Sequence, residues 1–209
     1  MDDSANPSLK SDDYKKMEPF WTLVDDILEG RDAMRENAHI HLPSFPDESA
    51  EDYAFRKANA KFTNIYGDIA ENLALRPFTK PVTMTEEGAP DELVQFAADV
   101  DGSNNSLHNF AKDLFYGGMN RGVEWVLVDY SKATTANATV EDERNLGVRP
   151  YWVRYPATSI IDVRSEMVNG EEKFVHVRIS VPKKVRNGFA EKMVNRIKVF
   201  DRPAIAPGV

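Results

Sequence analysis

The chain has 209 residues, a formal net charge of −8 and no cysteine. Its length predicts one domain or two small ones, and the missing cysteines exclude a disulfide framework, a thiolate metal site and a cysteine nucleophile. The longest strongly apolar run, Val123–Val128, is too short to span a bilayer, and the acidic N-terminus is unlike a signal peptide, so we expect an intracellular origin without a membrane partner.

Helices are predicted in the first part of the chain, after a flexible arm at residues 1–12. Apolar residues spaced three and four apart predict a first helix that starts near Pro19 and ends at Gly30. A capping box at Ser49 and Asp52 begins a second, long helix that ends before Pro77. Two short helices follow at residues 91–98 and 106–116, and Gly117-Gly118 is expected to end the latter.

Strands are predicted from residue 123 onward, where the apolar period changes to two. Val123–Tyr130 has a nearly continuous apolar run and is expected to be a central strand. Asn169-Gly170 is the preferred pair of a type I′ hairpin turn. Other strands are expected at residues 151–155, 160–164, 174–181 and 196–200. A polar insertion is expected at 131–148, with a helical turn at 140–146 inside it. Residues 183–191 are expected to form a loop.

This order of elements predicts an α+β fold, with N-terminal helices, one of them long, followed by a mostly antiparallel sheet. We expect a single domain over residues 13–209 that is helical at 13–118 and rich in strands at 119–200. The last residues, 201–209, contain no clear final element. They could be a natural flexible end, but we expect the chain to be truncated at its C-terminus.

Two segments contain residue types that bind metals. His39 and His41 would share one face of a strand and could ligate a metal, but no third or fourth ligand is nearby, so surface loop histidines are the alternative. Asp99, Asp101 and the following residues to Asn105 resemble a calcium loop, although Gly102 and Phe110 do not fit EF-hand spacing. A turn with a helix N-cap is the expected role of that segment.

The glycine-rich segment 117–122 follows a helix and precedes a strand, the opposite order from a phosphate-binding loop. The sequence also contains no Walker motif, nucleophile elbow or zinc-protease motif. We therefore expect no enzyme, no catalytic, cofactor-binding or metal-binding residues, and no cofactor. A hydrolase or metal enzyme centred on His39 and His41 is a third hypothesis.

Several segments, taken in order, resemble the portal proteins of tailed bacteriophages. They are Trp21–Gly30, His41-Leu42-Pro43, Tyr53–Asn64, Asp99–Gly102 with Ser106-Leu107 and Phe110, Gly118–Asp129, Gly147–Pro156 and Ile160–Arg164. At His41 the family often has tyrosine. Portal chains are normally much longer, so the resemblance implies that the stem, the crown and much of the channel lining lie beyond residue 209 or are missing.

The resemblance implies the outer α/β wing of a portal subunit. Such subunits form a ring, usually dodecameric, that stands at one vertex of the virion capsid and is made in the host cytoplasm. The ring contacts the capsid, the packaging motor and the tail connector, and double-stranded DNA passes through it during packaging and ejection. No catalytic residue is implied, because the motor hydrolyses ATP.

Charge is divided unevenly, which leaves an alternative function open. Residues 149–209 contain 12 Lys and Arg against 6 Asp and Glu, and the first 148 residues contain 14 against 28. The basic part could contact nucleic acid or an acidic partner as a non-catalytic binding module, or it could be a solvated surface. Lys183, Lys184 and Arg186, with Arg178, Lys192, Arg196 and Lys198, would form the basic patch, although Arg196 and Lys198 are expected on opposite faces.

Overall fold

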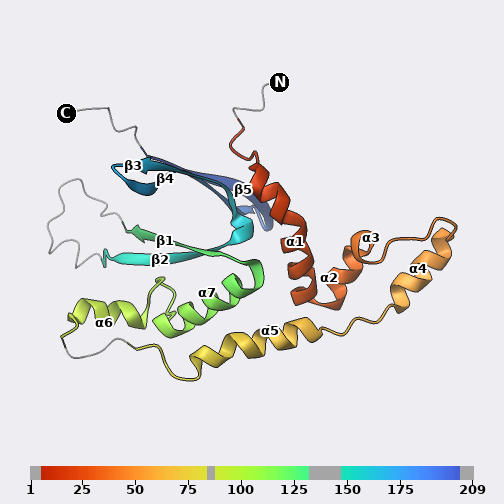
Figure 1. Cartoon of the computed structure of the whole chain (residues 1–209), viewed down its shortest axis with the longest axis horizontal. Coiled ribbons are helices and arrows are strands. Elements are labelled where there is room, and N and C mark those ends of the chain that lie inside the picture. Colours follow the sequence, from red (N-terminus) through yellow and green to blue (C-terminus); the bar gives the residue numbers. More distant parts are fainter. Residues whose placement is uncertain (1–5, 84–87, 132–146, 203–209) are drawn as a thin grey trace. The chain divides into compact units, whose positions relative to one another are not determined.

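A computed structural model describes residues 6–83, 88–131 and 147–202 of the chain (Figure 1). The chain divides into two compact units, one of Met1–Trp21 with Pro156–Val209 and the other of Thr22–Tyr155. This division differs from the expected one, in which helices to residue 118 and strands from 119 form two parts of a single domain.

Helices precede strands, and the predicted α+β class with antiparallel sheets is confirmed. The helices are α1 (Asp12–Glu29), α2 (Arg31–Glu36), α3 (Ala38–His41), α4 (Ala50–Asn59), α5 (Ile65–Leu75), η2 (Arg76–Phe78), α6 (Asp91–Ala98), α7 (Leu107–Arg121) and η3 (Ala157–Ser159). The strands are β1 (Glu124–Tyr130), β2 (Pro150–Pro156), β3 (Ile160–Val168), β4 (Glu171–Asn187) and β5 (Ala190–Asp201). The helical turn expected at 140–146 lies outside the described residues.

The core of the first unit lies where the start of α1 meets the sheet β3-β4-β5. Tyr14, Trp21, Ala157 and Ile161 are buried together, and Ile197 packs against them. The Tyr14 and Trp21 rings meet edge to face with centroids 5.3 Å apart. The Tyr14 hydroxyl donates to the Thr158 carbonyl at 3.0 Å, so a buried phenol keeps a hydrogen-bond partner.

Helix α1 begins earlier than predicted, and Pro19 lies inside it and not in its first turn. The Ser11 hydroxyl accepts a hydrogen bond from the Tyr14 backbone N–H at 3.2 Å and so caps the helix start. The Ser11 backbone N–H donates to the Ile161 carbonyl at 3.0 Å. Residues 6–12 of the expected arm are therefore bound to the sheet, and the Pro7 carbonyl also accepts from Arg178.

Two hairpins build the sheet β3-β4-β5. Asn169 and Gly170 both have positive φ, 54° and 81°, which confirms the predicted turn. The loop predicted at residues 183–191 is wrong, because β4 continues to Asn187 and turns at Gly188-Phe189 into β5. Gly188 makes this possible with a φ of 65°, a conformation that glycine adopts without steric cost.

The second unit has an aromatic core between α6, α7 and β2. Trp152 packs against Phe96 and Phe110, with ring centroids 5.1 Å and 5.6 Å away, and Val100 beside them is fully buried. Strand β1 pairs with β2 in a two-stranded sheet. The prediction that β1 is a central strand is therefore wrong for the described residues; its apolar run includes side chains that are exposed, such as Val128.

The long helix predicted between Ser49 and Pro77 is wrong, because α4 and α5 are separate helices. The predicted cap at Ser49 is confirmed, since its hydroxyl accepts the Asp52 backbone N–H at 3.1 Å. Asn64 starts α5 by accepting the Gly67 backbone N–H at 2.8 Å, while its amide donates to the Ile27 carbonyl at 2.8 Å. This local cap and tertiary bond stabilise an interruption that continuous apolar spacing does not predict.

Helix α7 does not end at Gly117-Gly118 but continues to Arg121, and Gly122 caps it with a φ of 84°. The glycine at 117 is required by packing: a Cβ there would lie 2.6 Å from the Glu124 side chain. That side chain is 2% exposed and binds Arg154 at 2.8 Å. Burial raises the pKa of the Glu124 carboxyl, and the charges of Arg154 and Arg121 oppose this shift.

A matched pair of substitutions tests this close contact. Gly117→Ala is expected to lower the free energy of unfolding by about 1–3 kcal/mol, because it displaces a buried side chain. Gly118→Ala, whose added Cβ would lie 3.8 Å from its nearest neighbour, is expected to raise it by about 0.5–1 kcal/mol through helix propensity. Urea unfolding followed by circular dichroism measures both, and equal shifts of the same sign would contradict the packing role of Gly117.

No helix within residues 6–83, 88–131 and 147–202 is long and apolar enough to cross a membrane.

Candidate interaction surfaces

Helix α5 has two different apolar faces. Its inner face consists of small residues, Ala70 and Ala74, which are buried. The helix packs on α7, and the Tyr66 hydroxyl donates to the Asn120 side-chain oxygen at 2.9 Å. Alanines allow the two helix backbones to approach closely, so α5 is held in place by a face that contains none of its large aliphatic side chains.

The outer face of α5 consists of Ile65, Ile69 and Leu73, which are 62%, 54% and 47% exposed. These residues follow one another at intervals of four, so their side chains lie in a row along the helix. Isolated exposed apolar residues are normal on protein surfaces, but an aligned row indicates an interaction surface. Asp68 and Glu71 are also exposed on α5, but helical spacing places Glu71 on the opposite side from the row. The exposed Arg76, which directly follows α5, continues the row.

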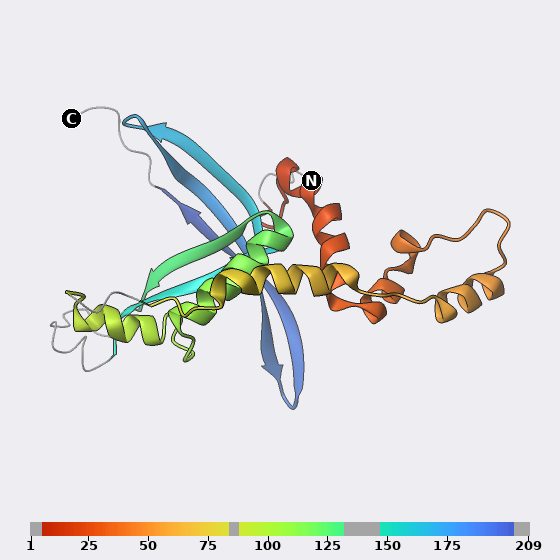
Figure 2. The same ribbon diagram turned by 60° about the horizontal axis from the view of Figure 1, so that its bottom comes forward.

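A second candidate surface is the part of the β4–β5 hairpin that continues beyond β3. Strand β3 pairs with β4 only as far as Ile179, whereas β4 and β5 remain paired to Asn187 and Ala190. Figure 2 shows the two strands running on together beyond the rest of their sheet. We call residues 180–187 and 190–197 the basic ribbon, because they contain Lys183, Lys184, Arg186, Lys192 and Arg196 against the single acid Glu191.

The register divides the ribbon's cations between two faces. On one face Lys184 pairs with Glu191 at 3.2 Å, and Arg186 donates to the Gly188 carbonyl at 2.8 Å. The other face carries Lys183, Lys192 and Arg196. Arg196 and Lys198 lie two residues apart in one strand and share that face, so the prediction that they point to opposite faces is wrong. Phe189, at the tip of the hairpin, is fully exposed.

The two histidines of the predicted metal site do not converge. Both lie in the short helix α3, where residues two apart point in different directions. His39 is exposed, whereas the side chain of His41 is buried and its Nε2 lies 2.7 Å from Asp26 Oδ2. The Asn37 amide donates to both Asp26 oxygens at 2.9 Å. His41 is therefore neither a loop histidine nor a member of a pair with His39; it is part of a buried polar cluster.

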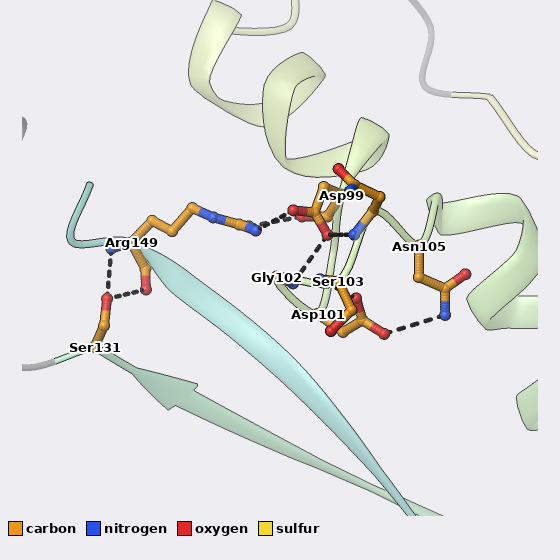
Figure 3. A network of polar contacts seen from close by, with 8 residues as sticks. Asp99, Asp101, Gly102, Ser103, Asn105, Ser131 and Arg149 are labelled. Atoms are coloured by element: carbon orange, nitrogen blue, oxygen red, sulfur yellow. Dashed lines mark hydrogen bonds and ion pairs between the residues drawn. The ribbon is translucent and has the colours of Figure 1, made fainter.

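The segment from Asp99 to Asn105 is the predicted turn and helix cap (Figure 3). Asp99 Oδ1 accepts the backbone N–H groups of Gly102 and Asn104 at 2.9 Å and 3.1 Å, and Asp99 Oδ2 binds Arg149 at 2.7 Å. The Ser106 hydroxyl caps α7. Burial alone would raise the pKa of Asp99, but the Gly102 N–H and the Arg149 charge outweigh it and lower the pKa.

These contacts use both oxygens of the Asp99 carboxylate within the protein. Among the described residues, no group of three or more His, Asp or Glu side chains could hold a metal ion. The described surface therefore offers contact areas, on α5 and on the basic ribbon, and sequence reasoning missed the first of them. The sequence does contain a pattern that could have indicated the α5 surface: small residues, Ala70 and Ala74, lie on a different side of the helix from its large aliphatic residues.

Comparison with known protein families and with curated proteins found no match to this chain.

Proposed function

We propose that the protein is a structural subunit that assembles with copies of itself and acts without catalysis of its own. The observation that carries this proposal is the row of Ile65, Ile69 and Leu73 on the outer face of α5. Fully burying a side chain of this size contributes roughly 1.5–3 kcal/mol, so a partner that covers the row gains several kcal/mol before the cost of association.

The resemblance of the ordered segments to phage portal proteins supports a particular kind of assembly. We propose a ring of the portal type at the capsid vertex of a virion, which contacts the capsid, the packaging motor and the tail connector and through which double-stranded DNA passes. A ring needs two different surfaces on each subunit, and the apolar row on α5 and the basic ribbon differ in this way.

A concentration series in light scattering tests self-association. Ile69→Glu places a charge in the middle of the exposed row, so it is expected to weaken self-association by tenfold or more. Leu93→Glu on α6 is the matched control, because Leu93 is exposed on a helix but lies outside the row. Equal association of the wild type and both variants would contradict a role for α5, provided that circular dichroism shows all three folded.

A further inference from the structure

One face of the basic ribbon presents mainly positive charge. We call it the cation face, and its cross-strand pairs are Val181 with Arg196, Lys183 with Val194, and Val185 with Lys192. The three cations are exposed, whereas the three valines between them are half-buried. The long cationic side chains therefore form most of the surface that a partner would meet.

The register spaces the three charges evenly along the ribbon. Lys183 lies diagonally across from both Lys192 and Arg196, about 7–8 Å from each. Lys192 and Arg196 are four residues apart on β5, about 14 Å at 3.4 Å per residue. A partner that meets all three cations must therefore offer negative charge at regular intervals over that length.

The cations of this face have no acid to neutralise them among residues 6–83, 88–131 and 147–202, where no acidic side chain forms an ion pair with any of the three. The opposite face differs, because Lys184 binds Glu191 there at 3.2 Å. The surrounding residues 149–209 contain 12 Lys and Arg against 6 Asp and Glu. This part of the chain therefore attracts a polyanion, although the chain as a whole has a net charge of −8.

The composition of the cation face is unlike that of a protein–protein contact. The centres of such contacts are apolar and aromatic and are depleted in lysine. Here two of the three exposed side chains are lysines, and the valines are already partly covered. A protein partner would gain little apolar burial on this face.

The free edge of β4 in the ribbon also disfavours the addition of a protein strand. The Val175 carbonyl accepts from the Arg202 N–H, so odd-numbered residues of β4 turn their backbone groups toward β5. Even-numbered residues, Pro182 among them, turn theirs toward the edge that β3 leaves free. Proline has no N–H to donate, and proline and lysine on an edge oppose strand pairing.

A nucleic acid duplex fits the spacing and the shape. It carries one negative charge per about 1.7 Å of its axis, so about eight phosphates lie along the 14 Å between the outer cations. The ribbon extends beyond β3 (Figure 2), and the major groove admits a two-stranded ribbon of this kind. Proteins that bind single strands stack the bases on aromatic side chains, and the cation face carries none.

We propose that the cation face of the basic ribbon binds the phosphate backbone of duplex DNA without regard to base sequence. Contacts from Lys and Arg to phosphates fix position but carry no sequence information. The inference rests on the proposed function for its setting, because it names the surface that meets the DNA passing through the ring. The opposite face of the ribbon, with the exposed Met193, stays free for contacts between subunits.

Fluorescence anisotropy of a short random-sequence DNA duplex, titrated with the full chain over a salt series, tests the inference. Three phosphate contacts predict that the logarithm of the affinity falls with the logarithm of the salt concentration at a slope of about −2.7 per bound chain. The ribbon variant combines Lys183→Gln, Lys192→Gln and Arg196→Gln. It is expected to bind at least tenfold more weakly at low salt and to lose this slope.

A second triple variant controls for net charge. It combines Lys16→Gln, Lys61→Gln and Lys80→Gln, which are exposed and lie outside the ribbon. It lowers the net charge by the same amount and is expected to keep the wild-type slope and to bind within threefold of the wild type. Circular dichroism checks that both variants are folded. Equal loss of binding in the two variants would show that overall charge acts and would overturn the inference.

The outcomes separate this inference from the proposed assembly. A wild type that forms a ring but does not bind the duplex would overturn the role of the ribbon and leave the assembly standing. Salt-dependent binding by a chain that stays single, lost only in the ribbon variant, would support the ribbon site and contradict the assembly. Unchanged duplex binding with weakened self-association in the ribbon variant would assign the cation face to a second copy and overturn the inference.

Discussion

Trp21→Ala is expected to lower the free energy of unfolding of the first unit by about 3–5 kcal/mol. Trp21 is 7% exposed and packs edge to face on Tyr14, in a small core completed by Ala157 and Ile161. So few large side chains cannot rearrange to fill the space left by an indole. Loss of the aromatic pair itself adds about 0.5–1.5 kcal/mol to the loss of apolar burial.

Chemical denaturation followed by far-ultraviolet circular dichroism measures this effect without relying on the fluorescence of the removed side chain. Phe20→Ala is the matched control, because Phe20 precedes Trp21 in the same helix and its side chain is exposed. The control is expected to change the unfolding free energy by less than about 0.5 kcal/mol. Equal effects of the two substitutions would show that the start of α1 does not pack on the sheet as described.

His41→Ala is expected to lower the unfolding free energy of the second unit by about 2–3 kcal/mol, whereas His39→Ala changes it by less than about 0.5 kcal/mol. The reason is Asp26, which is 7% exposed and loses one of its two partners when the imidazole is removed. Asn37 remains bonded to both oxygens of the carboxylate, so the loss is limited.

The same pair of substitutions tests the metal-site hypothesis. We expect zinc or nickel ions to leave the melting temperature of the wild type unchanged, because Asp26 already binds His41 and His39 lies on a different side of α3. A metal-dependent rise in melting temperature that is lost in both His variants would contradict this arrangement and restore the histidine pair as a ligand set.

Features of the fold that depend on a few neighbouring residues could be predicted from the sequence. The bounds of α6, the cap at Ser49 and the turn at Asn169-Gly170 are confirmed because local hydrogen bonds and backbone preferences determine them. The class of the fold follows from the order of periodic segments. These predictions did not require knowledge of what each segment packs against.

Features that depend on tertiary contacts could not be predicted. The break between α4 and α5 relies on the bond from Asn64 to the distant Ile27 carbonyl, and Gly117 is permitted inside a helix because Glu124 fills the space beside it. Residues 183–191 of the ribbon were predicted to be a loop. Both faces of the ribbon contain polar residues, so no buried face marks these residues as a strand pair. The exposure of Ile69 likewise depends on which side of α5 packs on α7.

Native mass spectrometry of the purified chain tests the central claim, self-assembly into a closed ring, most directly. One chain has a mass of 23.6 kDa. We predict a single large species of fixed subunit number, which Ile69→Glu reduces to single chains, and electron microscopy is expected to show that species as a ring. A mass that stays at that of one chain at every concentration would contradict the claim.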